Sequence, residues 1–178
     1  MRKLLLKSIA FGPLTEPAPQ PDDAAIAELA GRVKGASYKR LGRALSIREV
    51  DAGSCNACEL EIHALNNVLY DLERFGLRFV ASPRHADVLL VTGPVTQNMR
   101  VALERTYHAT PDPKWVVAVG QCARDGGVFA ASEACVGGVS KVVPVDLHIE
   151  GCPPSPIALL KGLLALLETV NAGSTPTR

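Results

Sequence analysis

The stretch Lys114–Gly127, KWVVAVGQCARDGG, decides the fold of this chain. Its apolar run Trp115–Val119 predicts a short buried strand, and a glycine and Cys122 follow at the point where that strand ends. Four other runs have the same strand-like character: Leu45–Val50, Leu77–Ala81, Val88–Val91 and Lys141–Val145. Short buried runs that alternate with helical patterns are typical of a parallel sheet with helices on both faces. The sequence therefore predicts an α/β fold.

The segments between the strands have helical spacing. One apolar face consists of Ile62, Leu65, Leu69 and Leu72, and another consists of Met99, Ala102, Leu103 and Thr106. Ser155 is expected to cap a last helix that starts at Pro156. This last segment is apolar on nearly all sides, so the helix is predicted to be buried.

The chain divides into four segments. Residues 1–21 are expected to form an N-terminal arm and a proline-rich linker, with four prolines in Gly12–Pro21, and residues 172–178 are expected to form a disordered tail. Residues 22–44 form a short helix, capped by Asp22 or Asp23 and ending near Ala30, followed by a basic connector. Residues 45–171 form the α/β domain. The basic, apolar start of the arm suggests docking on a membrane surface or a membrane subunit, with disorder as the alternative.

Composition excludes several classes of protein. The 178 residues carry 19 Lys and Arg against 18 Asp and Glu, so nothing indicates nucleic acid as a partner. No apolar run matches a signal peptide or reaches the ~20 residues of a membrane span. We therefore expect a cytoplasmic chain, in which the five cysteines are thiols or metal ligands rather than disulfides.

Four of these cysteines follow predicted strands. Cys55 and Cys58 come after the first strand, Cys122 after Trp115–Val119, and Cys152 after Lys141–Val145. The loops beyond the carboxyl ends of parallel strands meet at one edge of the sheet, so we expect these four thiols to converge. Four cysteine thiolates are the ligands of a 4Fe-4S cluster. The sequence thus predicts one such cluster, with glycines at 120 and 151 where the backbone turns tightly.

Other uses of these cysteines fit less well. Zinc sites usually place a second ligand pair about 12 to 20 residues after the first, and Cys122 lies much farther than that from Cys58. A thioredoxin-like dithiol at Cys55 and Cys58 is the stronger alternative, although it leaves the other two cysteines without a role. Cys135 has no partner at a useful spacing and is interpreted as a packed thiol.

Two carboxylates follow the cysteine pair directly. Glu59 and Glu61 are candidates for a proton route beside a redox centre, although the first turn of a helix favours acidic residues in any case. The histidines lack metal-binding spacing, and the paired glycines lack the context of a nucleotide-binding loop.

Taken together, these motifs resemble two related families. They are the small subunits of membrane-associated, energy-converting nickel-iron hydrogenases, formate hydrogenlyase-like complexes included, and the 20 kDa cluster subunits of respiratory complex I. The resemblance rests on DAGSCNACELEIHALNN (51–67), RHADVLLVTGPVT (84–96), KWVVAVGQCARDGG (114–127) and GCPPSP (151–156). The complex I subunits typically carry adjacent cysteines where this chain has Cys55-Asn-Ala-Cys58. The hydrogenase branch is therefore favoured, and a subunit of an NADH-quinone oxidoreductase is the alternative.

The resemblance has several implications. The fold is expected to be flavodoxin-like, and Cys55, Cys58, Cys122 and Cys152 are expected to ligate a 4Fe-4S cluster beside the active site of a hydrogenase-like large subunit. The other expected partners are a ferredoxin-like 4Fe-4S subunit and integral membrane subunits, which would hold the chain on the inner face of the cell membrane. Residues 93–96 are expected to face the large subunit, and Glu59 or Glu61 to lie near the proton route. The chain is an electron-transfer subunit in this view, without turnover of its own.

Overall fold

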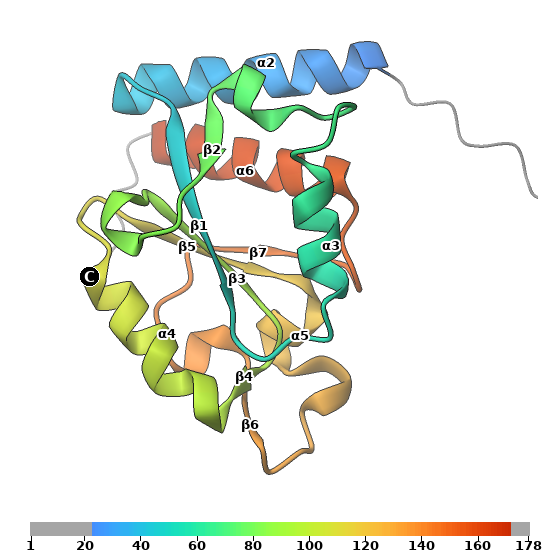
Figure 1. Ribbon diagram of the computed structural model, residues 1–178, viewed down its shortest axis with the longest axis vertical. Coiled ribbons are helices and arrows are strands. Elements are labelled where there is room, and N and C mark those ends of the chain that lie inside the picture. Colours follow the sequence, from blue (N-terminus) through green and yellow to red (C-terminus); the bar gives the residue numbers. More distant parts are fainter. Residues whose placement is uncertain (1–22, 172–178) are drawn as a thin grey trace, which may run out of the picture.

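A parallel five-stranded sheet forms the centre of the computed structural model, which describes residues 23–171 (Figure 1). Its strands are β1 (Leu45–Asp51), β2 (Leu77–Phe79), β3 (Val88–Thr92), β5 (Trp115–Val119) and β7 (Leu147–Ile149). They lie in the order β2-β1-β3-β5-β7, and each neighbouring pair is parallel. This is the flavodoxin-like strand order. The predicted fold class is confirmed.

Helices cover both faces of this sheet (Figure 1). On one face pack α2 (Asp23–Leu41), α3 (Ala57–Ala64) and α6 (Pro156–Asn171), and on the other pack α4 (Gln97–Ala109) and α5 (Gly120–Asp125). Successive residues of β3 alternate between the two cores, because side chains of a strand point to opposite faces. Both faces are covered, so all five residues of β3 are buried.

The last helix was predicted correctly. Pro156 is its first residue, and Oγ of Ser155 accepts a hydrogen bond from the backbone N–H of Ala158 at 3.3 Å. This bond satisfies one of the N–H groups that a helix start leaves without a partner. Six leucines of α6 are buried against the sheet and the other helices: Leu159, Leu160, Leu163, Leu164, Leu166 and Leu167.

The strand predicted at Lys141–Val145 was wrong. Val139 and Val143 instead pack into the core beside α4 and α5, around a short 3-10 helix, η4 (Val139–Lys141). The strand begins six residues later, at Leu147. Asp146 fixes this start, because its backbone N–H donates to the carbonyl of Val116 and its carboxylate accepts from the N–H of Val116. The β-branched run therefore fills a core without entering the sheet.

The predicted end of the first helix near Ala30 was also wrong, because α2 continues to Leu41. Ile26, Ala30 and Val33 are buried in a row at helical spacing, and α2 packs along α6. Three basic residues of the stretch that suggested a connector are exposed on this helix: Arg32, Lys34 and Lys39. The arm (1–21), the tail (172–178) and the caps proposed at Asp22 or Asp23 lie outside the residues and side chains that the structure describes.

The helix predicted around Ile62 to Leu72 is shorter than its apolar spacing suggests. The helix α3 ends at Ala64, and the chain then turns until the 3-10 helix η1 (Leu72–Phe75). Leu65 and Leu72 are fully buried as expected, whereas Leu69 is 58% exposed. In α4, only Leu103 of the predicted apolar face is buried. The predicted strand Leu77–Ala81 is confirmed in shorter form, as Leu77–Phe79.

No helix within residues 23–171 combines the length and the apolar character that a membrane span requires.

The two leucines of the 62–72 segment give a matched test of this packing. We expect Leu65→Ala to lower the free energy of unfolding by about 2–5 kcal/mol, because it leaves a cavity in the core. The same change at the exposed Leu69 should lower it by less than about 1 kcal/mol. Denaturant titration of both variants checks this. Equal losses at the two positions would show that the segment is packed as a continuous helix.

Candidate metal centre

The first cysteine-bearing segment leaves the carboxyl end of β1 in a tight turn. The carboxylate of Asp51 accepts hydrogen bonds from the backbone N–H groups of Gly53 and Ser54, at 2.7 and 2.8 Å. Asn56 then adopts a left-handed conformation and begins α3, so that Cys55 lies on the turn and Cys58 in the first turn of the helix. Cys55 is exposed and Cys58 is half-buried.

The second segment begins where β5 ends. Gly120 is the first residue of α5 and has a φ of +86°, a conformation that a side chain disfavours. Cys122 lies two residues later in this short helix, and its side chain is half-buried. The N–H of Gln121 donates to the carbonyl of Gly151 at 2.9 Å, which ties this segment to the third one.

All three segments meet at Gly120. A Cβ atom built on this glycine would lie 2.7 Å from Sγ of Cys58 and 3.3 Å from the carbonyl oxygen of Gly151. A distance of 2.7 Å is too short for a carbon and a sulfur atom that are not bonded to each other. The lack of a side chain at residue 120 therefore allows the cysteine-bearing segments to approach one another.

Gly127 has the same relation to Cys122. Its Cβ would lie 2.8 Å from Sγ of Cys122, and its φ is +50°. Asp125 supports this turn, because Oδ1 accepts a hydrogen bond from the N–H of Gly127 at 2.8 Å. Two of the four sulfurs are thus bordered by glycine backbone, a surface on which a bulky inorganic group can rest.

The third segment follows β7 and carries Cys152, whose side chain is exposed. Glu150 forms an ion pair with Arg124 of α5, a second link between this segment and the one that holds Cys122. Pro153 and Pro154 follow Cys152 directly and restrict the backbone there.

The four thiols lie within electrostatic reach of one another. Burial raises the pKa of the Cys58 thiol to about 12, and further increases come from four neighbouring groups: Glu59, Cys55, Cys122 and Cys152. Burial likewise raises the pKa of the Cys122 thiol, and Cys152 and Cys55 raise it further. The structure therefore brings together the four cysteines that the sequence singled out. Gathered thiolates repel one another, so a positive group between them would be stabilised.

The described residues contain no ready-made site for a single metal ion. Within residues 23–171, no three cysteine, histidine, aspartate or glutamate side chains are close enough to hold one ion. Metal–sulfur bonds of about 2.3 Å require sulfurs roughly 4 Å apart around one ion. A cube of iron and sulfide binds each thiolate at a different iron, so its ligands stand farther apart.

Cys135 does not belong to this group. It lies in β6 (Cys135–Gly137), which pairs with β4 (Val95–Thr96) in a separate two-stranded sheet, and it is half-buried. It is absent from the groups that raise the pKa values of the Cys58 and Cys122 thiols. The interpretation of Cys135 as a packed thiol remains a prediction.

The two candidate carboxylates differ in their surroundings. Glu59 is 6% exposed, and neither of its carboxylate oxygens has a hydrogen-bond partner among the described residues. Glu61 is half-buried. Glu49 of β1 was not singled out from the sequence, yet burial raises the pKa of its carboxyl group, and Glu59 raises it too. Oε2 of Glu49 lies 3.5 Å from Nε2 of His63, which is largely exposed. Glu59 is thus close enough to both Glu49 and Cys58 to raise their pKa values.

The segment at residues 93–96 packs against the first cysteine turn. A Cβ on Gly93 would lie 2.6 Å from Cα of Ser54, and one on Gly53 would lie 2.2 Å from Cγ2 of Thr96. The N–H of Thr96 also donates to the carbonyl of Ala52 at 2.8 Å. This segment thus holds the cysteine turn in place.

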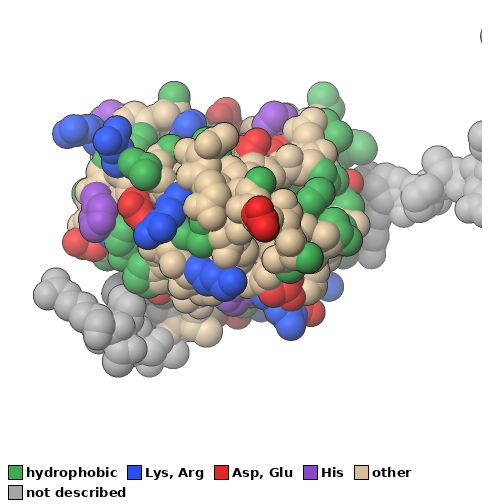
Figure 2. All heavy atoms as spheres, turned by 90° about the horizontal axis from the view of Figure 1, so that it is seen from below, with side chains coloured by type: hydrophobic (Ala, Val, Ile, Leu, Met, Phe, Trp, Pro, Cys, Tyr) green, Lys and Arg blue, Asp and Glu red, His purple; other side chains and the backbone are tan. Residues whose placement is uncertain are grey.

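Several exposed apolar side chains lie close to the cysteines in the sequence. Leu60 follows Cys58 by two residues and is 61% exposed, and Val128, beside Gly127, is 84% exposed. Phe129 is exposed at the same turn. Figure 2 looks onto this end of the molecule, where hydrophobic side chains are interspersed with charged side chains of both signs.

Comparison with known proteins shows one matching family and several similar proteins. Residues 55–166 match the family described as NADH ubiquinone oxidoreductase, 20 kDa subunit. Formate hydrogenlyase subunit 7 of Escherichia coli is 44% identical over 155 residues, which are 85% of this chain and 59% of that protein. A protein of Pyrococcus furiosus named "Probable membrane-bound hydrogenase subunit mbhJ" is 46% identical over 73% of this chain and 78% of its own length.

Two solved structures have a similar fold. A chain of the membrane-bound sulfane sulfur reductase, described as an archaeal respiratory membrane complex, superposes with a TM-score of 0.67 at 34% identity, over 81% of this chain and 77% of that one. A chain of the [NiFeSe]-hydrogenase of Dm. baculatum superposes with a TM-score of 0.52 at 20% identity, over 75% of this chain and 66% of that one. The second likeness concerns the fold alone.

Alanine variants of two glycines with positive φ distinguish the effect of backbone strain from the effect of crowding at the cysteines. Gly120→Ala places a methyl group against Cys58, whereas Gly42→Ala, at φ +67°, meets nothing within 4 Å. Both variants should lose about 1 kcal/mol of stability from the unfavourable conformation. Only Gly120→Ala should lower the iron bound per chain after anaerobic purification. Full iron in Gly120→Ala would show that the three segments need not approach as described.

Proposed function

This chain belongs to the family of the NADH ubiquinone oxidoreductase 20 kDa subunit, and we propose that it is the 4Fe-4S electron-transfer subunit of a membrane-associated, hydrogenase-type complex. The observation that carries the proposal is the meeting of three cysteine-bearing segments at Gly120. A bound 4Fe-4S cluster would supply one-electron oxidation and reduction.

The residues present fit such a cluster. Four cysteines on three segments provide its four thiolates: Cys55, Cys58, Cys122 and Cys152. Glycines border two of the sulfurs and leave room beside them. The mutual repulsion of the thiolates and the burial of Cys58 would be offset by iron, as metal binding deprotonates thiols. This chain's own part is to hold the four sulfurs in fixed positions.

A partner subunit is part of the proposal. Val128 and Phe129 are exposed on the turn whose backbone contacts Cys122, so a large subunit docked there would cover the cluster and exclude water. The names of the relatives support a membrane-bound, hydrogenase-type complex. The resemblance noted from the sequence implies a hydrogenase-like large subunit, a ferredoxin-like 4Fe-4S subunit and integral membrane subunits on the inner face of the cell membrane as its other parts. The chain spans 59% of the length of the Escherichia coli relative, so these partners are inferred for the part that the two share.

The second candidate is a subunit of an NADH-quinone oxidoreductase, which the description of the family favours. The sequence Cys55-Asn-Ala-Cys58 separates the two, because the complex I branch typically has adjacent cysteines at this position. Hydrogen oxidation or evolution by the purified complex supports the first candidate, and quinone reduction without hydrogen chemistry supports the second.

The cysteines provide the main test. Replacing any of Cys55, Cys58, Cys122 or Cys152 with serine should reduce the iron, the acid-labile sulfide and the visible absorbance of the anaerobically purified complex to a small fraction. Cys135→Ser is the matched control and should keep all three. A thiol-disulfide protein would give the opposite pattern: a colourless chain whose activity depends on Cys55 and Cys58 only.

We also assign Glu59 to the proton route of the complex, ahead of Glu61, because its carboxylate is buried and has no hydrogen-bond partner among the described residues. Glu59→Gln should lower proton-coupled turnover about 100-fold or more, the lower end of what a proton-transfer group contributes. Iron content should stay unchanged. The exposed Glu73→Gln serves as the control, and Glu61→Gln in the same assay shows which carboxylate matters. Unchanged turnover in Glu59→Gln would remove this assignment.

A further inference from the structure

A second polar site lies at the opposite end of the sheet from the cysteines. The strands β1 and β3 begin there, at Leu45 and Val88, and the residues just before them line a hollow of about 220 Å³. Its charged lining consists of Arg43, Arg78, Arg84, His85 and Asp87. We refer to it as the arginine hollow. None of these residues takes part in the proposed electron transfer.

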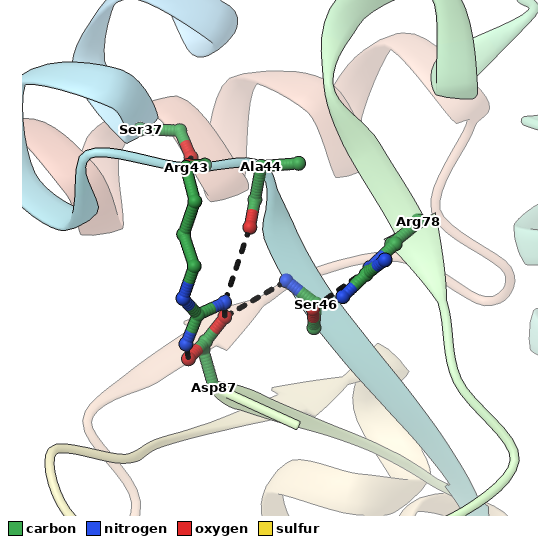
Figure 3. A network of polar contacts seen from close by, with 6 residues as sticks. All are labelled: Ser37, Arg43, Ala44, Ser46, Arg78 and Asp87. Carbon is green, nitrogen blue, oxygen red and sulfur yellow. Dashed lines mark hydrogen bonds and ion pairs between the residues drawn. The ribbon is translucent and has the colours of Figure 1, made fainter. Parts of the chain in front are cut away.

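The single carboxylate of the arginine hollow is already engaged. Figure 3 shows Asp87 between Arg43 and Ser46. The guanidinium of Arg43 donates to both carboxylate oxygens, at 2.6 and 2.8 Å, and the N–H of Ser46 donates to Oδ2 at 2.9 Å. Asp87 is 5% exposed, so these bonds also compensate its burial. Asp87 therefore holds Arg43 in place and has little capacity left for the other cations.

Arg78 is held from the other side. Its Nε donates to Oγ of Ser46 at 3.1 Å, as the close-up shows (Figure 3). This bond orients the guanidinium and leaves its two terminal nitrogens available, because a guanidinium has five N–H donors. Arg78 and Arg43 thus lie on either side of Ser46, both oriented by hydrogen bonds.

Arg84 and His85 complete the lining from a short 3-10 turn, η2 (Pro83–His85). The hydroxyl of Ser82 caps this turn by accepting from the N–H of Arg84, at 3.4 Å. Three arginines face one aspartate in the hollow, which leaves an excess of two positive charges when His85 is neutral. Like charges this close repel one another unless an anion lies between them.

We propose that the arginine hollow binds a phosphate group, with Arg78 and Arg84 as its main ligands and His85 as a third donor. The planar fork of a guanidinium matches two oxygens of a phosphate, and such charge-assisted bonds are stronger than neutral ones. The excess of two positive charges balances a phosphate dianion. The phosphate belongs either to a free anion or to the headgroup of an anionic lipid, since both present anionic oxygens that a guanidinium can bind. A phosphodiester headgroup carries one negative charge and balances only one of the two positive charges.

Titration of the full chain with inorganic phosphate, at constant ionic strength, tests the proposal by calorimetry. We expect one phosphate per chain. Arg78→Gln and Arg84→Gln should each weaken binding about tenfold or more, as expected for the loss of a charged hydrogen bond. Arg105→Gln, an exposed arginine of α4 outside the hollow, should change it by less than about twofold. Arg84→Lys, which keeps the charge but loses the fork, should give an intermediate loss and provides a test should either glutamine variant misfold.

Vesicles distinguish the two sources of the phosphate. Sedimentation with phosphatidylglycerol-containing vesicles, but not with pure phosphatidylcholine, and its loss in Arg84→Gln or Arg84→Lys would identify a lipid headgroup. Saturable binding of inorganic phosphate without vesicle binding would identify a free anion. The proposal is overturned when neither probe binds, or when both bind the Arg78→Gln, Arg84→Gln and Arg84→Lys variants as tightly as the unchanged chain.

Discussion

The contact between Gly120, Cys58 and Gly151 is the constraint on which the rest of this structure depends. Three loops from the carboxyl ends of β1, β5 and β7 can share one site only where backbone approaches sulfur without a side chain between them. The sheet brings the loops to the same edge, and the glycine allows the last step of their approach. The hydrogen bond from Gln121 to Gly151 and the ion pair between Arg124 and Glu150 then hold two of the three loops together.

Burial explains which strands and helices could be predicted from the sequence. Trp115–Val119 and Val88–Val91 were recognised because both faces of these central strands are buried, which gives continuous apolar runs. The last strand was misplaced because Val143 fills a core from an irregular segment, and β-branched residues alone do not distinguish that role from a strand. The length of α2 was missed because its buried face is narrow and its exposed face is basic, a pattern that α6 stabilises only in the folded chain.

Cys55, Cys58 and Cys122 were singled out from the sequence because they follow apolar runs that do form strands, whereas Cys152 was placed after a strand that was predicted at the wrong residues. Other parts of the site left weaker signals. Gly127 beside Cys122 was noticed only as one of a pair of glycines, since its contact with a sulfur depends on the turn that Asp125 stabilises. Glu49 gave no signal at all, because a carboxylate in a strand becomes notable only when burial and the neighbouring Glu59 are known. Its place beside Glu59 and His63 depends on tertiary structure alone.

The central claim is that one inorganic cube joins four sulfurs that are distant in the sequence. The most direct measurement is an electron cryo-microscopy structure of the anaerobically purified complex at a resolution that separates iron from sulfur. The account predicts density for one cube at the carboxyl edge of the sheet, bonded to Cys55, Cys58, Cys122 and Cys152 and covered by a partner subunit. A disulfide between Cys55 and Cys58, with Cys122 and Cys152 bound to nothing, would contradict it.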